Sequence, residues 1–216
     1  MPAKPTVSNS RGVPLRARLW DAFVRSIGVN LQKKRAIQRI IDRPGRILEV
    51  GCATGNVAGI FRQSEYVGVD IDQDSIALAA LRHPGRNYAF HCLDLLEDAL
   101  PFEAGFDHVL ISHTAHHLPD EYLLRLLERS SELLRPDGRL VVLDMLRPAP
   151  HEPLNRQFYY RLDRGRHFRT LNEFKTLFAR TNALCDTSFE VVRTTKWGIR
   201  VIDQVLISGR PRRAAQ

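Results

Sequence analysis

The segment 46–56, Arg-Ile-Leu-Glu-Val-Gly-Cys-Ala-Thr-Gly-Asn, constrains the fold of this chain more than any other. Its first five residues are mostly apolar and predict a buried strand over 46–50. A turn of small residues follows, and we expect a helix to begin at Asn56. A strand, a glycine-containing loop and a helix N-terminus form a nucleotide or nucleoside site at the carboxyl end of a parallel sheet. The segment therefore predicts an α/β fold with a ligand site at this strand end.

The spacing of the small residues decides between ligand classes. A dinucleotide-binding loop needs the pattern G-x-G-x-x-G. Counted from Gly51, it would place glycines at positions 53 and 56, where this chain has Ala53 and Asn56. A P-loop would need Gly-Lys-Ser/Thr over 56–58, where the chain has Asn-Val-Ala. The pattern present in this chain is E-x-G-x-A-x-G, which begins at Glu49. Because it matches neither loop, the sequence disfavours both a nicotinamide-dependent dehydrogenase and a P-loop enzyme.

Further landmarks follow this motif in a fixed order. A second apolar run, 66–70, ends at Asp70, which lies 19 residues after Gly51. This is close to the spacing of about 20 residues expected for a carboxylate that binds ribose hydroxyls. Later strands are predicted over 87–92, over 106–112 and, after a helix end and a Pro-Asp-Gly turn, within 133–144.

The landmarks together, over roughly 46–145, resemble the class I S-adenosylmethionine-dependent methyltransferases, in their small-molecule branch. The resemblance implies a Rossmann-like, doubly wound, seven-stranded sheet that is mostly parallel, with an antiparallel C-terminal strand. It implies S-adenosylmethionine as cofactor, S-adenosylhomocysteine as product, and methyl transfer to an oxygen, nitrogen or carbon atom of a small molecule. The alternatives are a non-catalytic or regulatory S-adenosylmethionine-binding protein, or an RNA or protein methyltransferase.

The resemblance also assigns expected cofactor contacts. We expect the strand–turn motif to contact the amino acid end of the cofactor. The end of the second strand is expected to bind the ribose and a face of the adenine, and the ends of the third and fourth strands to complete the site. The expected residues are Glu49, Gly51, Cys52, Ala53 and Gly55; Asp70 for the ribose and Ile71 against the adenine; Asp94 and Leu95 at the adenine edge; and Ser112. Asp72 and Asp74 are better explained as caps of a helix over 75–82.

The chemistry asks for few catalytic groups. The leaving thioether is neutral, so the protein must mainly place the nucleophile and, for oxygen or carbon, remove a proton. Histidine suits that task, and His113 and His117 are our candidates, with His113 first. Two other interpretations stay open: His113 only lines the pocket, and His117 only shapes the entry to a helix over 120–135. His113, His116 and His117 also resemble metal ligands, but no Asp or Glu stands close by at a position suited to a third ligand, so we predict no metal.

The chain outside the motifs divides into simple parts. We expect a disordered tail over 1–12 and two amphipathic cap helices over 13–45. The cofactor-binding domain spans 46–209, and a second tail spans 210–216. Within the domain, 147–169 is predicted to face the substrate, because it follows a strand's carboxyl end. Its aromatic and arginine side chains could hold an acceptor, including an anionic one, although a solvated helix explains them too; the candidate contacts are Tyr159, Tyr160 and Arg161.

A capping box at 170–173 predicts a helix to about 181, and the segments 188–193 and 200–208 predict a hairpin, with Trp197-Gly198 in its turn.

Composition excludes several classes. The formal charge of +8 is carried by 27 arginines and 5 lysines spread along the chain, a compositional bias that makes a nucleic-acid substrate unlikely. The segment 112–115, Ser-His-Thr-Ala, also lacks the Asn/Asp-Pro-Pro-aromatic motif of amino-methylating nucleic-acid enzymes. Three cysteines at unrelated spacings predict no disulfide and a reduced, cytoplasmic setting. No apolar run reaches the ~18 residues of a membrane span. The oligomeric state cannot be read from the sequence.

Overall fold

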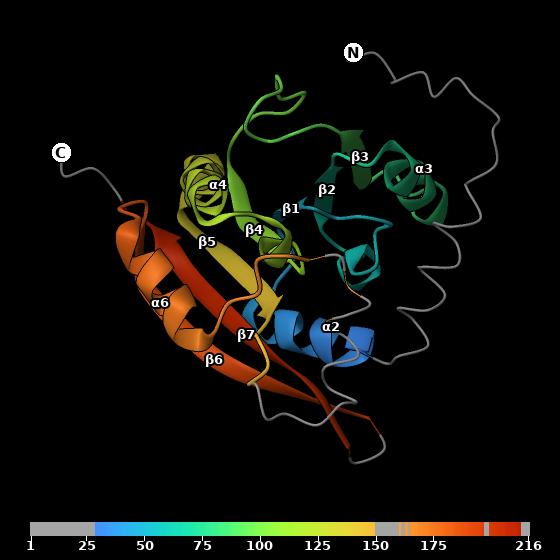
Figure 1. Ribbon diagram of the computed structural model, residues 1–216. Helices are drawn as coiled ribbons and strands as arrows, with labels where there is room; N and C mark the ends of the chain where they lie inside the picture. Colours follow the sequence, from blue (N-terminus) through green and yellow to red (C-terminus); the bar gives the residue numbers. More distant parts are fainter. Residues whose placement is uncertain (1–28, 150–159, 161–162, 164, 197–198, 213–216) are drawn as a thin grey trace.

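The computed structural model describes residues 29–149, 160, 163, 165–196 and 199–212. Its centre is one sheet with the strand order β3-β2-β1-β4-β5-β7-β6 (Figure 1). The strands are β1 (Arg46–Val50), β2 (Glu65–Asp70), β3 (Tyr88–Cys92), β4 (Phe106–Ser112), β5 (Leu134–Met145), β6 (Leu184–Lys196) and β7 (Ile199–Pro211). The helices are α2 (Val29–Ile40), α3 (Gln73–Arg82), α4 (Asp120–Leu133) and α6 (Leu171–Arg180), with short 3-10 turns η1 (Ala58–Ile60) and η2 (Ala115–His117).

The strand directions confirm the predicted fold. The neighbours from β3 to β5 pair in parallel, and β7 runs antiparallel to both β5 and β6. From β1 the chain first builds β2 and β3 on one side, and then crosses over to place β4 on the other side of β1. In open α/β sheets, ligands bind outside the carboxyl ends of the strands at such a reversal. The carboxyl ends of β1 and β4 are therefore where a ligand site belongs.

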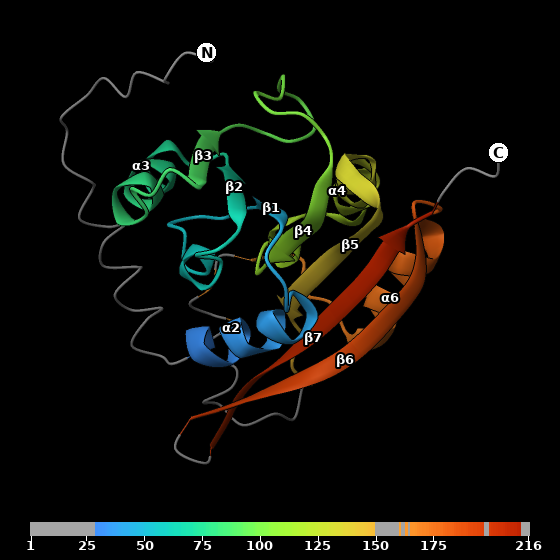
Figure 2. The ribbon, with the colours of Figure 1, turned by 180° about the vertical axis from the view of Figure 1, so that it is seen from behind.

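Helices cover both faces of the sheet (Figures 1 and 2). On one face, Leu123 and Leu127 of α4 and Phe174 of α6 share a buried cluster with apolar side chains of β1, β4, β5 and β7. On the other, Ile37 of α2 belongs to a second cluster with Leu110 of β4 and other strand residues. Alternate residues of each strand serve the two clusters, as the two-residue period of a strand requires. The sheet thus separates two hydrophobic cores and contributes side chains to both.

The helix predicted to begin at Asn56 is wrong. Residues 53–57 are turns, and the segment continues only as the 3-10 turn η1. The chain has 14 residues, 51–64, to return from the end of β1 to the start of β2. That return spans about 17 Å for a five-residue strand. An α-helix rises only about 1.5 Å per residue and would use nearly all of them, whereas a 3-10 turn rises about 2.0 Å per residue.

Other boundaries moved less. The predicted Pro-Asp-Gly turn lies inside β5, where the pairing with β4 shifts register between Phe106 and His108. The predicted hairpin is present and longer, as β6 and β7, while Trp197-Gly198 lies outside the described residues. β7 reaches Pro211, so the sheet extends past the predicted domain end at 209. The described residues contain no helix both long and apolar enough to cross a bilayer.

The predicted capping devices are confirmed. Asp72 caps α3 by accepting from the backbone N–H of Asp74, and Thr170 and Glu173 form the capping box of α6. Of the two cap helices predicted over 13–45, the second corresponds to α2, and the first falls outside the described residues.

Candidate cofactor and acceptor site

The turn after β1 is tightly packed at the expected site. The backbone N–H groups of Gly51 and Cys52 both donate to the carbonyl of Val69, at 2.8 and 3.0 Å, which ties the turn to β2. Gly51 has a φ of +71°, and a Cβ there would lie 2.3 Å from Oγ1 of Thr114. Only glycine fits both that conformation and that contact. The turn is thereby held between the ends of β1, β2 and β4.

Asp70 ends β2 beside this turn. Its Oδ2 accepts from the backbone N–H of Ala53 at 2.8 Å, and its Oδ1 accepts from that of Asp72 at 2.9 Å. Burial raises the pKa of Asp70, against the effect of these backbone donors. Each oxygen keeps a further acceptor site, so the carboxylate is fixed in position and able to accept from two vicinal hydroxyls.

Two side chains in the predicted set have surroundings that call for a ligand. Ile71, directly after β2, exposes 75% of its surface, although most large apolar residues of the described chain are buried. Ser112, at the end of β4, has a buried hydroxyl with no hydrogen-bond partner among the described residues. A buried hydroxyl without a partner costs free energy, so such a group is informative. An apolar ring against Ile71 and a polar group at Ser112 would satisfy both.

The third-strand residues are engaged within the protein. Both carboxylate oxygens of Asp94 accept from the Tyr122 hydroxyl of α4 at 2.6 Å, and Oδ1 also accepts from the backbone N–H of Leu96. Leu95 is buried in the core on the α4 face, so only its backbone remains for a ligand. The adenine-edge role assigned to Asp94 and Leu95 stays a prediction.

Glu49 is buried beneath the turn, near a buried basic side chain. It accepts a short hydrogen bond from the Tyr66 hydroxyl of β2. Burial raises the pKa of Glu49 to about 7, although the nearby ammonium of Lys33 acts in the opposite direction. Burial likewise lowers the pKa of Lys33, which is only 7% exposed on α2. A buried acid near the end of β1 and a buried base on α2 thus lie near each other, and burial favours the neutral form of each.

Cys52 and Gly55 complete the expected turn. The Cys52 side chain is buried, and burial raises the pKa of its thiol well above the usual range, so it is neutral. Its sulfur would lie 2.8 Å from a Cβ at Gly68, so it points back toward β2. Gly55 has a φ of +71°, and its carbonyl is 3.0 Å from Nε2 of His83 on α3. The side of the turn that faces β2 and α3 is therefore packed against the protein, and its backbone is what remains for contact with a ligand.

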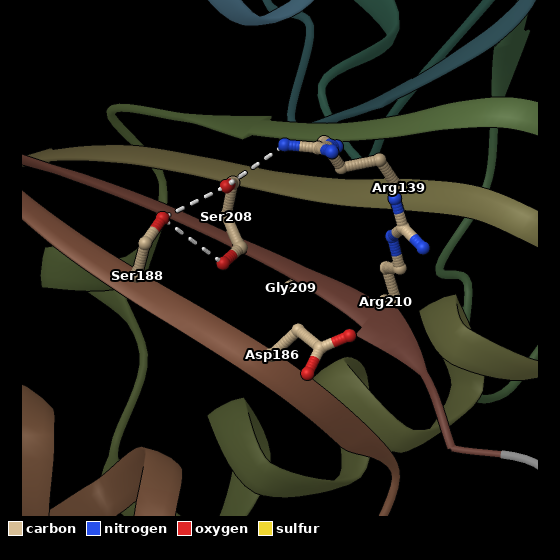
Figure 3. A pocket seen from close by; sticks show the side chains of 6 residues that line it. All are labelled: Arg139, Asp186, Ser188, Ser208, Gly209 and Arg210. Carbon is tan, nitrogen blue, oxygen red and sulfur yellow. Dashed lines mark hydrogen bonds between the residues drawn. The ribbon is translucent and has the colours of Figure 1, made fainter.

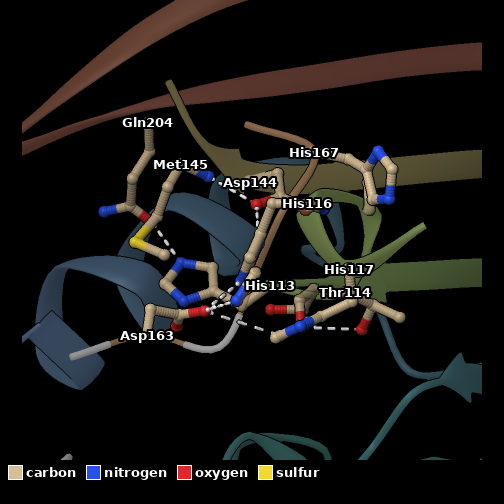
Figure 4. A network of polar contacts seen from close by, with 12 residues as sticks. His113, Thr114, His116, His117, Asp144, Met145, Asp163, His167 and Gln204 are labelled. Carbon is tan, nitrogen blue, oxygen red and sulfur yellow. Dashed lines mark hydrogen bonds and ion pairs between the residues drawn. The ribbon is translucent and has the colours of Figure 1, made fainter. Parts of the chain in front are cut away.

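His113 leads the chain out of β4 in a strained conformation, with a φ of +56°. Its Nε2 lies 2.7 Å from Oε1 of Gln204 on β7 (Figure 4). The Gln204 amide nitrogen in turn donates to Oγ1 of Thr194 at 2.6 Å. The amide orientation makes Nε2 the protonated nitrogen of the ring and leaves Nδ1 as an acceptor. Burial lowers the pKa of His113 to about 3, so the imidazole is neutral and only weakly basic.

His116 lies between two carboxylates. Its Nδ1 is 2.5 Å from Oδ1 of Asp144 at the end of β5, and its Nε2 is 3.1 Å from Oδ1 of Asp163. Burial alone would lower the pKa of His116, but the two carboxylates outweigh it and raise the pKa to about 10. The neighbouring His117 is less buried, and burial together with the His116 charge lowers its pKa. One ring is thus charged and the other neutral.

The segment predicted to face the substrate is anchored on His116. The backbone N–H groups of Arg166 and His167 both donate to the His116 carbonyl, at 3.1 and 2.9 Å. Phe168 stacks on the His116 ring, with centroids 4.9 Å apart. A Cβ at Gly165 would come within 2.2 Å of that ring. This part of the chain therefore lies directly over the loop that follows β4.

The predicted acceptor contacts have mixed outcomes. Tyr159 and Arg161 lie outside the described residues. Tyr160 donates its hydroxyl to the Leu146 carbonyl at 2.6 Å and packs against Phe168, so its ring and hydroxyl serve the protein interior. Arg169 is buried and binds Asp120 and the carbonyls of Ala115 and Leu118. Acceptor contact by this segment stays a prediction.

A separate pocket lies at the other end of the sheet, near the start of β5 and between β6 and β7 (Figure 3). Its lining is polar, with Ser188 and Ser208 joined by a hydrogen bond of 3.0 Å between their hydroxyls. The lining includes one acidic side chain, Asp186, and two arginines, Arg139 and Arg210. The lining residues are Arg139, Asp186, Ser188, Ser208, Gly209 and Arg210.

Several site residues were not found from the sequence. Lys33 carries a signal, since it lies three and four positions before Ala36 and Ile37 on the buried stripe of α2. Gln204 and Asp163 carry none, because each reaches its histidine partner only through the fold, across 91 and 47 positions respectively.

Comparisons with known proteins agree with this geometry. A family model described as a methyltransferase domain matches residues 25–186. Malonyl-[acyl-carrier protein] O-methyltransferase of Bacillus cereus is 33% identical over 100 residues, covering 44% of this chain and 36% of its own. An uncharacterized methyltransferase of Bacillus pumilus is 32% identical over 114 residues, covering 51% and 52%. The chain thus spans between about a third and a half of these relatives.

Solved structures share the fold at low identity. Human N-acetylserotonin methyltransferase in complex with SAM superposes with a TM-score of 0.65 at 19% identity, covering 91% of this chain and 55% of that one. A likeness at this identity concerns the architecture. The family model, in contrast, covers well over half of the sequence, so this chain belongs to the methyltransferase-domain family.

Proposed function

We propose that this chain binds S-adenosylmethionine and transfers its methyl group to a small-molecule acceptor. The observation that carries the proposal is the joint placement of the Gly51 turn and Asp70 at the reversal point of the sheet. When bound, the cofactor supplies an electrophilic methyl group on a good, neutral leaving group. The protein then has to bind, orient and shield the reactants.

The chain's own residues fit this cofactor. The Asp70 carboxylate is held so that it can accept from the two ribose hydroxyls. Ile71 offers an exposed apolar surface for the adenine, and the buried Ser112 hydroxyl lacks a partner. Glu49 and Lys33, both buried near this strand end, are one acidic and one basic side chain that could contact the amino acid end of the cofactor. The turn presents no pattern for a phosphate.

On the acceptor side, His113 is our candidate for the group that receives a proton. Its Nδ1 is left as an acceptor by the Gln204 contact. A pKa near 3 makes it a weak base, so it is matched to an acceptor whose proton becomes acidic only as the methyl group is transferred. His117, neutral and partly exposed, is the second candidate. One relative is named malonyl-[acyl-carrier protein] O-methyltransferase, and one protein of the same fold is named N-acetylserotonin methyltransferase. We propose a small organic acceptor here as well.

The setting proposed is the reducing cytoplasm, in keeping with Cys52, Cys92 and Cys185 all being free thiols. A non-catalytic, cofactor-binding role is the alternative. It shares the cofactor site and differs only in turnover.

The first test is ligand binding by thermal shift and calorimetry, with S-adenosylmethionine, S-adenosylhomocysteine and NAD as ligands. A ligand at about 100 times its Kd adds about 2.7 kcal/mol to the unfolding free energy, or roughly 5–10 °C for a domain of this size. We expect a shift with the first two ligands and none with NAD. Asp70→Ala should abolish it, while Asp74→Ala, on the first turn of α3, should not. A shift with NAD alone would overturn the cofactor assignment.

The second test separates catalysis from binding. Methyl transfer from labelled cofactor to a panel of phenols, carboxylates and amines should be found for the wild-type chain. His113→Gln should lower kcat while the cofactor Kd stays unchanged. Binding without transfer to any acceptor class would favour the non-catalytic alternative.

A further inference from the structure

We propose that His116, His117 and Asp163 form a binding site for one divalent transition-metal ion. One donor atom from each residue lies within 4.8 Å of the other two. Oδ1 of Asp163 is 3.1 Å from Nε2 of His116 and 3.8 Å from Nε2 of His117 (Figure 4). Metal binding is measurable without cofactor or acceptor, so this inference does not depend on the proposed methyl transfer.

These distances match those between ligands of one ion. Histidine nitrogens and carboxylate oxygens bind Zn²⁺ at about 2.0–2.2 Å. Two such ligands at angles of about 90–110° therefore stand about 3.0–3.5 Å apart. The Asp163–His116 separation lies in that range already. The Asp163–His117 separation of 3.8 Å exceeds it by a few tenths of an ångström, and the His117 ring is the least buried of the three side chains.

The surroundings of His116 are those of an oriented metal ligand. Asp144, fully buried, holds Nδ1 of His116 at 2.5 Å and also accepts from the His116 backbone N–H at 3.1 Å. A carboxylate on the far nitrogen of a ligating histidine fixes the ring and makes the metal-facing nitrogen a better donor. Phe168 stacks on the same ring and prevents it from tilting. Nε2 of His116 is thus aimed at Asp163 by three independent contacts.

The charges and donor types narrow the kind of ion. Asp144 and Asp163 bring two carboxylates to His116, and their negative charge favours a bound cation. Two imidazoles and one carboxylate suit Zn²⁺, Fe²⁺, Co²⁺ or Ni²⁺ better than Mg²⁺ or Ca²⁺, which prefer oxygen ligands. Three protein ligands leave at least one position for water or for an acceptor oxygen.

The fold assembles the site from two separate segments. His116 and His117 belong to η2, immediately after β4, and Asp163 belongs to the segment that follows β5. Gly165 donates its N–H to Oδ1 of Asp163 at 2.6 Å, which orients the carboxylate. The same contacts would also serve an ion-pair clamp between the two segments. The clamp needs no metal, so the two explanations differ in a direct measurement.

The experiment is a titration of the purified, tag-free, chelator-treated protein with Co²⁺, read by visible absorption and calorimetry, and with Zn²⁺, read by elemental analysis after dialysis. We expect one ion per chain and d–d bands from Co²⁺ bound to nitrogen and oxygen. Asp163→Asn and His117→Asn should each weaken binding at least tenfold. His167→Asn is the matched control, because His167 lies in the same segment but outside the set, and it should bind as the wild type does.

A control for folding accompanies each variant. The thermal shift with S-adenosylhomocysteine should be retained by His117→Asn, whose ring is partly exposed, even if Asp163→Asn is destabilised. Absence of stoichiometric Co²⁺ and Zn²⁺ binding by the wild type, or equal binding by His117→Asn, would overturn the metal site and leave the ion-pair clamp. Failure of the cofactor shift with intact metal binding would contradict the proposed function and not this site.

Discussion

At the scale of a single residue, the conformation of Gly51 gives the most sharply defined prediction of what a substitution does. Gly51→Ala forces a side chain into a left-handed conformation and against Thr114, so we expect a loss of about 1–3 kcal/mol in unfolding free energy and weaker S-adenosylhomocysteine binding. Gly59→Ala is the control, because its Cβ would meet its nearest neighbour at an ordinary 3.5 Å. Urea unfolding and calorimetry measure the two effects. Equal behaviour of both variants would show that the Gly51 turn is not constrained.

Glu49 predicts a dependence of stability on pH. Its pKa is about 7 in the folded protein against 4.5 for a solvent-exposed glutamate, because burial favours the protonated form. The folded state therefore binds the proton more tightly, so this stabilisation is complete below pH 4.5 and is lost as pH rises through about 7. The loss is up to about 3 kcal/mol for a shift of this size.

Glu49→Gln tests this pH dependence, since glutamine keeps an acceptor for the Tyr66 hydroxyl and cannot ionise. Unfolding free energies of both proteins between pH 5 and 8 should diverge, with the wild type losing more. Parallel curves would mean that Glu49 stays ionised throughout, held by Lys33.

The positions of candidate site residues were predictable where they depend on strand ends. Gly51, Asp70 and Ser112 follow strands whose order can be read along the chain, and the structure brings them to one edge of the sheet. Asp94 lies at the expected strand end, but the sequence gives no sign that Tyr122, 28 positions away, would occupy its carboxylate. Side-chain partners from distant elements depend on packing, which has no local pattern.

At the scale of elements, the start of α6 gives a direct test. Thr170 accepts from the backbone N–H of Glu173, and the Glu173 carboxylate accepts in return from that of Thr170. Thr170→Ala removes the cap and should cost about 1 kcal/mol. Thr170→Ser should retain most of it, and denaturant unfolding compares them. A serine variant as unstable as the alanine variant would mean that the threonine methyl group, rather than the cap, stabilises the helix start.

The elements show where sequence patterns succeed. Strands β2 and β4 were predicted almost to the residue, because short apolar runs with clear ends can form little else. The helix expected at Asn56 failed because the number of residues between two strands, rather than their type, decides what fits there. The antiparallel direction of β7 came from the family resemblance, whereas its position between β5 and β6 was not predicted, because no pattern in the strand itself indicates it.

At the scale of the whole molecule, the two cores share one sheet and should unfold together. Leu127, fully buried between α4 and the sheet, is expected to cost 2–5 kcal/mol on substitution by alanine. Leu124→Ala, at a partly buried position of the same helix, should cost less. Far- and near-ultraviolet circular dichroism should report one coincident transition for each protein. Transitions that separate would mean that the α2 face unfolds independently.

The 3-10 turn η1 has a consequence for which molecules compete for the site. A full α-helix after the Gly51 turn would direct the positive end of its dipole at the bound ligand, and that field attracts phosphates. With only a single turn, nucleotides and dinucleotides gain little there, and a positively charged sulfonium meets little repulsion. The site would then discriminate against the abundant phosphorylated metabolites of a cell because it lacks the helix N-terminus that attracts phosphate. No side chain would be needed to repel them.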